Sequence, residues 1–149
     1  MKSQFLKSSS ILIICLFLLS CNNTKKLDLN SVNANFYIGG LFGTSYIVTI
    51  KNQQLTYLTR RGNKKLKEQK QTISIDDIRL LENKLLELGA NQWRKKYINS
   101  HVSDGTHWGI KYTSSTLHIN SQGSNLYPDN FEALTQYISQ TLLKGKTFQ

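Results

Sequence analysis

The stretch SYIVTIKNQQLTYLT, residues 45–59, decides the fold class of this chain. Apolar residues occur at every second position, so an extended backbone places them all on one face. The pattern breaks at the polar residues 51–54, which are typical of a turn, and then resumes. It therefore predicts an antiparallel hairpin with one buried face, formed by Tyr46, Val48 and Ile50 before the turn and by Leu55, Tyr57 and Thr59 after it.

An amphipathic helix is predicted to follow this hairpin. Ser74 and Asp77 resemble a capping box, with Asp in place of the usual Glu, and Gly89 is a natural C-terminal stop. Between these signals, apolar residues recur at helical spacing, so one face of the helix should cover the sheet. These residues are Ile78, Leu81, Leu85 and Leu88.

A second hairpin and a second helix are predicted in the C-terminal third. Trp108, Ile110 and Tyr112 alternate inward, and a two-residue turn at Ser114-Ser115 pairs Lys111 with His118. Asp129 and Glu132 then resemble another capping box. The helix that follows carries its apolar face at Phe131, Leu134, Ile138 and Leu142.

These elements predict an α+β domain over residues 36–149. Its antiparallel sheet would contain two hairpins and a short first strand that begins at Phe36. Gly39, Gly40 and Gly43 suggest a bulge or turn after that strand. Both helices would cover one face of the sheet.

The chain begins with a signal-like segment. Lys2 and Lys7 precede the apolar run 11–19, which is shorter than the roughly 20 residues that a membrane-spanning helix needs. The following Leu18-Leu19-Ser20-Cys21 resembles the lipobox of bacterial lipoproteins. That resemblance implies removal of residues 1–20 and acylation of Cys21, which attaches the protein to a membrane. The competing interpretation is an ordinary signal peptide without lipidation, although its cut site usually carries two small residues.

Residues 21–35 are mostly polar and predict a flexible tether. Well-studied enteric lipoproteins are retained in the inner membrane by an aspartate after the acylated cysteine. Asn22 stands there in this chain, so the resemblance favours the outer membrane, with the domain facing the periplasm.

The charge of the chain points to anionic partners. Nineteen Lys and Arg against nine Asp and Glu give a net charge of +10, which falls to +8 once Lys2 and Lys7 are removed. In the cytoplasm such a balance suggests nucleic acid. In the envelope the abundant anions are lipid headgroups, lipopolysaccharide phosphates and cell-wall carboxylates, so no nucleic-acid partner is predicted.

The basic residues are densest in the segment 60–71, where Glu68 is the only acidic residue. One interpretation is a hairpin rim or a solvated loop whose charge protects an edge strand from pairing with another chain. The other is a patch that docks on an anionic glycan or lipid surface. The first is favoured because charge runs usually face solvent. The candidate anion-binding residues are Arg60, Arg61, Lys64, Lys65 and Lys67.

The segment 101–108 contains the densest group of reactive side chains, with His101, Asp104 and His107. These residues are candidates for a metal or acid–base site. The predicted strand, however, places the His107 side chain outward and separates it from His118 by roughly 13 Å. Zinc holds its nitrogen ligands at about 2 Å, so these two cannot share an ion. No Gly-x-Ser-x-Gly motif occurs, and no free cysteine remains beside Cys15 in the signal segment and the acylated Cys21. We therefore predict no catalytic residue, metal or cofactor.

One more resemblance covers about the last third of the chain. The segment Asp104-Gly105-Thr106-His107-Trp108 precedes Gly123-Ser124-Asn125-Leu126-Tyr127-Pro128-Asp129-Asn130-Phe131. Together they resemble a bacterial domain of unknown function with the pattern Asp-Gly-Thr-x-Trp, then Gly-Ser-Asn-x-Tyr-Pro-x-x-Phe. The second segment is interpreted as a structural corner or as the lip of a ligand site. Turn geometry explains its glycine, asparagine and proline and favours the corner.

Three functional hypotheses remain open. The first is a lipid-anchored, non-catalytic envelope protein that binds a partner or ligand through its open sheet face or basic rim. The second is an envelope enzyme that uses His101 or His107 with Asp104. The third is an inhibitor or immunity-type protein with a tight protein partner.

Overall fold

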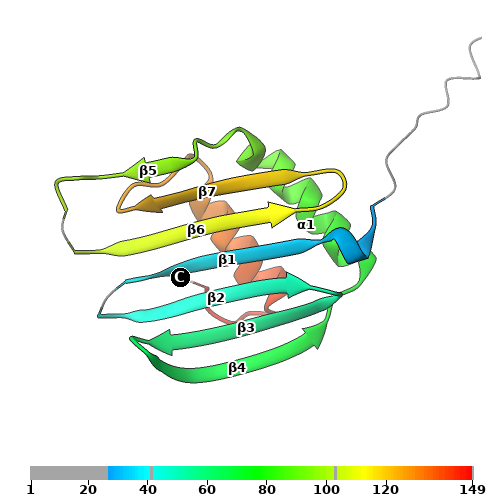
Figure 1. Ribbon diagram of the computed structural model, residues 1–149, viewed down its shortest axis with the longest axis horizontal. Coiled ribbons are helices and arrows are strands. Elements are labelled where there is room, and N and C mark those ends of the chain that lie inside the picture. Colours follow the sequence, from blue (N-terminus) through cyan, green and yellow to red (C-terminus); the bar gives the residue numbers. More distant parts are fainter. Residues whose placement is uncertain (1–26, 41, 103, 149) are drawn as a thin grey trace, which may run out of the picture.

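A seven-stranded open sheet, in the order β4-β3-β2-β1-β6-β7-β5, forms the centre of the molecule (Figure 1). The computed structural model describes residues 27–148 without residues 41 and 103. All neighbouring strands are antiparallel except β5 and β7. With its two helices the domain has an α+β fold. The strands are β1 (Asn33–Gly40), β2 (Thr44–Lys51), β3 (Gln54–Arg61), β4 (Lys64–Thr72), β5 (Lys96–Ile98), β6 (Thr106–Thr113) and β7 (His118–Ser124).

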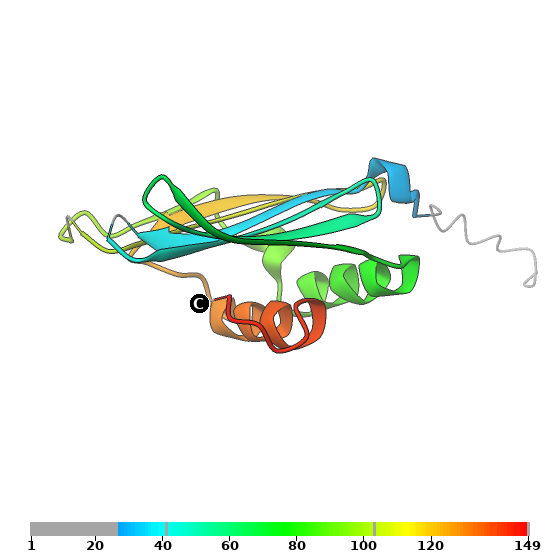
Figure 2. The same cartoon turned by 90° about the horizontal axis from the view of Figure 1, so that it is seen from below.

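Both helices lie on the same face of the sheet and leave the other face open (Figure 2). They are α1 (Ile75–Glu87) and α2 (Phe131–Tyr137), and α2 continues into a π-helical turn at Ile138–Leu142. Short 3₁₀ turns occur at Leu29–Ser31 and Ala90–Gln92. None of the helices among the described residues is long and apolar enough to cross a membrane.

The first hairpin, β2–β3, forms as predicted. Lys51 pairs with Gln54, and the two residues between them have positive φ angles, 49° at Asn52 and 59° at Gln53. Two such residues form the tight turn whose twist matches that of the flanking strands. The alternating residues predicted to face inward are buried, apart from Tyr46, which is half-buried and packs against the core.

The helix α1 also has the predicted boundaries. Ser74 accepts a hydrogen bond from the Asp77 amide, and the Asp77 side chain accepts one from the Ser74 amide, which completes the capping box. Gly89, with φ of 69°, ends the helical path. Ile78, Leu81 and Leu85 are fully buried against the sheet.

The predicted first strand and tether are wrong in part. The strand β1 is neither short nor peripheral, because it spans eight residues and lies at the centre of the sheet between β2 and β6. It starts at Asn33, and Leu27, Val32 and Ala34 are buried, so the ordered domain begins before residue 36. The sequence does not predict this start because the inward-facing position 34 holds a small alanine between two asparagines. The alternation of apolar and polar residues is therefore weak there. Residues 21–26 of the predicted tether lie outside the described residues.

The basic segment 60–71 is a strand and not a loop, so the sheet contains more than two hairpins. β4 pairs with β3 along its length, with a bulge between Thr59 and Arg60, and forms one edge of the sheet. Nearly all of its side chains are exposed, because an edge strand is held by backbone pairing and needs no buried face. Gln71 alone reaches inward and donates a hydrogen bond to the Leu142 carbonyl at 2.9 Å.

The start of α2 differs from the prediction. Asn130 occupies the N-cap in a left-handed conformation, with φ of 62°, and its side chain makes no capping hydrogen bond. Asp129 and Glu132 therefore form no capping box. The predicted apolar face is correct, since Phe131, Leu134 and Ile138 are buried with Leu142.

The C-terminal segment returns to the sheet beneath β3. Phe148 is buried, and the Tyr57 hydroxyl donates a hydrogen bond to the Thr147 carbonyl at 2.7 Å. Burial raises the pKa of the Tyr57 hydroxyl. This tail thus closes one side of the core without belonging to a helix or strand.

The predicted register of β6 and β7 is wrong by two residues. Thr113, not Lys111, pairs with His118, because the loop between the strands spans four residues and not two. Glu82 of α1 contacts this loop from the helix-covered side of the sheet. Its buried carboxyl group accepts hydrogen bonds from the Ser114 and Thr116 hydroxyls and, at 3.0 Å, from the Tyr112 hydroxyl. Burial, followed by the nearby Glu82 charge, raises the pKa of Tyr112. Glu82 therefore links α1 to the hairpin and to its four-residue loop.

Replacement of Glu82 by alanine should destabilise the domain. The buried Tyr112 hydroxyl would lose its carboxylate partner, as would the Ser114 and Thr116 hydroxyls, which costs about 1–3 kcal/mol. Urea unfolding monitored by circular dichroism measures the difference. The matched control is Glu87→Ala on the exposed side of the same helix, which should change the stability by no more than about 0.5 kcal/mol. Equal effects of the two substitutions would contradict a stabilising role of the Glu82 hydrogen bonds.

Candidate functional site

The two segments that resemble the bacterial domain of unknown function contact each other at one end of the sheet. The Asn125 amide donates to the Thr106 carbonyl at 3.0 Å, and the Asn125 side-chain oxygen accepts from the Thr106 amide at 2.9 Å. Asn125 has φ of 55°, which Asn tolerates better than most residues. This pair extends the β6–β7 ladder by one step and turns the chain toward α2.

The Trp108 side chain holds the next part of the same corner. Its indole Nε1 donates to the Leu126 carbonyl at 2.8 Å. The ring lies 4.7 Å from Phe131 between centroids and is stacked on Tyr127 at 6.3 Å and 21°. Such aromatic pairs contribute beyond the area that they bury. Tyr97 and Trp93 complete the cluster from the other side.

Gly123 of β7 makes this arrangement possible. A Cβ atom at that position would overlap Trp108 Nε1 and would lie 2.7 Å from the Leu126 carbonyl oxygen. The glycine of the second segment is therefore required by the tryptophan of the first. The predicted structural corner is confirmed by these contacts.

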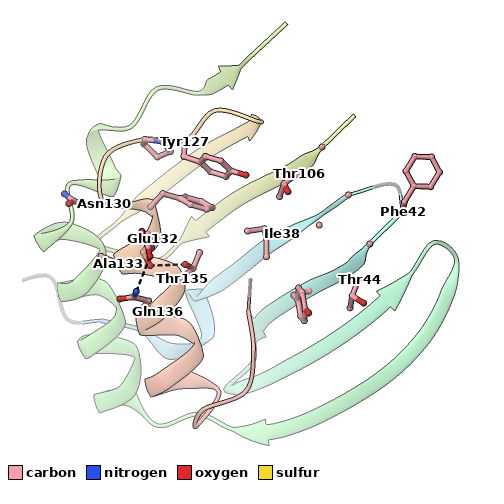
Figure 3. A pocket seen from close by; sticks show the side chains of 17 residues that line it. Ile38, Phe42, Thr44, Thr106, Tyr127, Asn130, Glu132, Ala133, Thr135 and Gln136 are labelled. Carbon is pink, nitrogen blue, oxygen red and sulfur yellow. Dashed lines mark hydrogen bonds between the residues drawn. The ribbon is translucent and has the colours of Figure 1, made fainter. Parts of the chain in front are cut away.

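The same corner forms one wall of a pocket of about 1150 Å³ between α2 and the ends of β1, β2 and β6 (Figure 3). The pocket lies on the helix-covered face of the sheet, beside the β1–β2 loop. The sheet and its loops contribute Ile38, Gly39, Gly40, Phe42, Gly43, Thr44, Tyr46, Gly105 and Thr106, and the corner and α2 contribute Tyr127, Pro128, Asn130, Phe131, Glu132, Ala133, Thr135 and Gln136.

The lining combines aromatic rings with neutral polar groups. Tyr46, Tyr127 and Phe131 supply rings, and Phe42 stands at the rim with 84% of its surface exposed. Threonine hydroxyls supply hydrogen-bonding groups. The backbone at Gly39-Gly40, Gly43 and Gly105 supplies more, because glycine has no side chain that covers it. Concave sites with mostly apolar walls and a few polar groups are typical of small-molecule binding.

Among the described residues of the lining, Glu132 is the only carboxylate, and none is lysine, arginine or histidine. The side chain lies on α2 and accepts a hydrogen bond from Gln136 Nε2 at 3.4 Å (Figure 3). Acid–base catalysis between paired groups needs a second ionisable partner within hydrogen-bond reach. The described lining offers Glu132 only neutral polar partners, namely hydroxyl and side-chain amide groups.

The structure does not bring the histidine cluster together as a site. His101, Asp104 and His107 are all exposed, none of them lines the pocket, and His107 lies on the open face of the sheet. In the part of the chain that the structure describes, no three His, Cys, Asp or Glu side chains are grouped to hold a metal ion. Cys21 lies outside the described residues.

The five candidate anion-binding residues are divided between the two faces of the sheet. Arg60 and Lys65 form a cross-strand pair on the open face. Lys67 pairs with the buried Thr59 and therefore lies on the helix-covered face, as do Arg61 and Lys64 beside the turn. A hydrogen bond from Lys65, together with its charge and that of Lys70, lowers the pKa of Glu68. The residues thus do not form one patch.

Most pocket residues were not predicted as a site from the sequence. Thr44, Tyr46 and Ile38 look like ordinary strand residues, and Thr135 and Gln136 like ordinary helix residues. The available signal was the second segment, since Tyr127, Pro128, Asn130 and Phe131 all line the pocket. The segment that forms the corner therefore also forms part of the pocket wall.

No protein-family model matches the chain, and no curated protein matches it in sequence.

Substitution of Gly123 by alanine should disrupt the corner. The added methyl group must displace the indole or the Leu126 backbone, and such overpacking costs about 1–3 kcal/mol. Thermal unfolding and near-ultraviolet circular dichroism, which reports the packing of Trp108, would measure the effect. Gly109→Ala on the paired strand is the control, because its new Cβ would lie 4.0 Å from the nearest side chain, that of Gln122. If both variants keep wild-type stability and spectra, the corner does not depend on Gly123.

Proposed function

We propose that this protein is a bacterial lipoprotein, attached to the outer membrane through acylated Cys21 and facing the periplasm. The support is the short apolar segment 11–19 and the lipobox-like residues 18–21. No cofactor and no nucleic acid enter the proposal.

The domain acts by binding and not by catalysis, and its ligand site is the pocket between α2 and the ends of β1, β2 and β6. The observation that carries this function is the lining itself: aromatic rings and neutral polar groups around one carboxylate, without an acid–base or nucleophile–base pair. The ligand is a small molecule, or an exposed part of an envelope protein, with an uncharged or cationic group.

The charge of the ligand follows from Glu132. A ligand carboxylate or phosphate would meet a negative side chain and no positive one in the lining, whereas an amine would meet a carboxylate beside aromatic rings. Aromatic faces attract cations by about 0.5–2 kcal/mol, more where water is excluded. The pocket therefore selects against anions even though the chain as a whole is strongly basic.

A pocket-filling variant tests this site. Ala133 lines the pocket but is exposed and lies outside the core, so Ala133→Phe should fill the site without loss of stability. Gln140→Phe adds a similar ring to an exposed position nearby that is not part of the lining. Fragments of neutral, cationic and anionic character are screened by ligand-observed NMR. Neutral or cationic binders that are lost in Ala133→Phe and retained in Gln140→Phe support the proposal, and Glu132→Gln should weaken the cationic ones about tenfold.

An anion-only set of binders, or binding unaffected by Ala133→Phe, would contradict the proposed pocket specificity. Because the screen reads the domain alone, its failure leaves the anchoring proposal to a separate test.

The anchor is tested in cells that make the full chain. Palmitate labelling should be present in the wild type and lost in Cys21→Ser, and globomycin should cause the unprocessed form to accumulate. Mass spectrometry of the mature N-terminus provides an independent measurement. A mature chain that begins at a residue other than Cys21 would exclude the lipoprotein assignment.

A further inference from the structure

The open face of the sheet carries nearly all of its charge as Lys and Arg. Strand alternation places six basic side chains on the side away from the helices: Lys51, Arg60, Lys65, Lys70, Lys96 and Lys111. Each of them is exposed, and each lies next to a residue that points to the helix-covered face. Among the described strand residues, Glu68 is the one acidic side chain on this open face.

Glu68 neutralises only a small part of this charge. It forms ion pairs with Lys65 and Lys70 of its own strand, and these are the ion pairs found on this face within the described residues. Exposed pairs of this kind contribute little to stability and exchange readily with other partners. The open face therefore keeps a clear positive excess across its whole width, from β4 to β5.

The middle of the same face is apolar. Tyr37, Ile47 and Leu58 are direct cross-strand neighbours on β1, β2 and β3, and all three are half-buried. Ile98 of β5 lies on this side with 62% of its surface exposed. Neither α1 nor α2 covers this face (Figure 2). A broad basic surface with apolar side chains among the charges matches the interface of an anionic bilayer.

The chain length to the proposed anchor favours a bilayer over a soluble polyanion. Only five residues separate Cys21 from Leu27, which is buried in the domain, so the chain length keeps the acylated cysteine within about 20 Å of it. The chain then enters the sheet through β1, where Asn33 pairs with Lys51 of the basic face. A lipid at Cys21 would therefore keep the domain, and with it this face, within reach of the headgroups.

We propose that the open sheet face lies against the anionic phospholipid surface of the membrane that holds the lipid anchor, and so turns the pocket on the opposite face away from the bilayer. This inference rests on the proposed acylation of Cys21. The face supplies orientation, since the acyl chains alone would let the domain rotate freely on its short connection. The pocket would then open toward the periplasm and its soluble ligands.

The test uses the full, lipidated protein reconstituted in vesicles, with single cysteines as labelling sites. After processing and acylation no other free thiol remains in the chain. Asn120→Cys places a fluorescent label on the open face, and Asn83→Cys places the same label on the exposed side of α1. Quenching by acrylamide, which is uncharged, is compared in vesicles with phosphatidylglycerol and in vesicles of phosphatidylcholine alone.

In phosphatidylglycerol vesicles the label at position 120 should be quenched at least about threefold less than the label at position 83. The difference should vanish in phosphatidylcholine and at about 1 M NaCl, where the screening length falls to about 3 Å. It should also vanish in Lys51→Glu/Lys111→Glu but persist in Arg79→Glu/Lys144→Glu, a variant with the same change in net charge outside the open face. Circular dichroism verifies that both double variants are folded.

Equal quenching at the two positions in phosphatidylglycerol, with the protein still floating with the vesicles, would overturn the orientation and leave the anchor intact. Protein that fails to float with any vesicle would overturn the proposed lipidation and this inference with it. Protection of position 120 by a soluble anionic polysaccharide in phosphatidylcholine vesicles, without any by phosphatidylglycerol, would identify a glycan as the partner and reject the bilayer.

Discussion

The close approach of the Trp108 indole to the backbone of β7 is the constraint on which the rest of the site depends. The ring fits only because Gly123 has no side chain, and from there Nε1 reaches the Leu126 carbonyl. That hydrogen bond fixes the chain after β7 and places Tyr127 and Phe131 around the indole. The start of α2, and with it one wall of the pocket, is therefore positioned by a contact between two adjacent strands.

The two faces of the sheet have different chemistry, and this separation organises the molecule. The helix-covered face contains the core and a pocket whose lining, as far as the structure describes it, includes one carboxylate and no basic side chain. The open face contains basic side chains around an apolar centre. The formal charge of +10 is therefore unevenly distributed, with a positive excess on the open face and none in the pocket lining that the structure describes. Because the sheet lies between them, a ligand in the pocket and an anion on the open face would not compete for the same groups.

The candidate site could be predicted from the sequence only where its residues are close in the chain. The Gly-Ser-Asn-x-Tyr-Pro segment identifies the corner because its turn residues have local conformational reasons to be there. The opposite wall has no such signal. Gly40 lines the pocket beside Gly105, and a Cβ on Gly40 would lie 2.6 Å from the Gly105 carbonyl oxygen. The local sequence at Gly40 predicts a bulge or turn. It gives no sign of the contact with Gly105, because that residue lies far along the chain.

The sequence by itself determined the β2–β3 hairpin, the bounds of α1 and most of the buried positions, because turn residues, capping groups and apolar periodicity act within a few residues. Only the tertiary structure decided that β1 is central and that the basic segment forms the edge strand β4. It also decided the register of β6 and β7 and the link from their loop to Glu82, which bonds residues about thirty positions away. These features depend on contacts between distant segments, and their free energy leaves no local pattern in the chain.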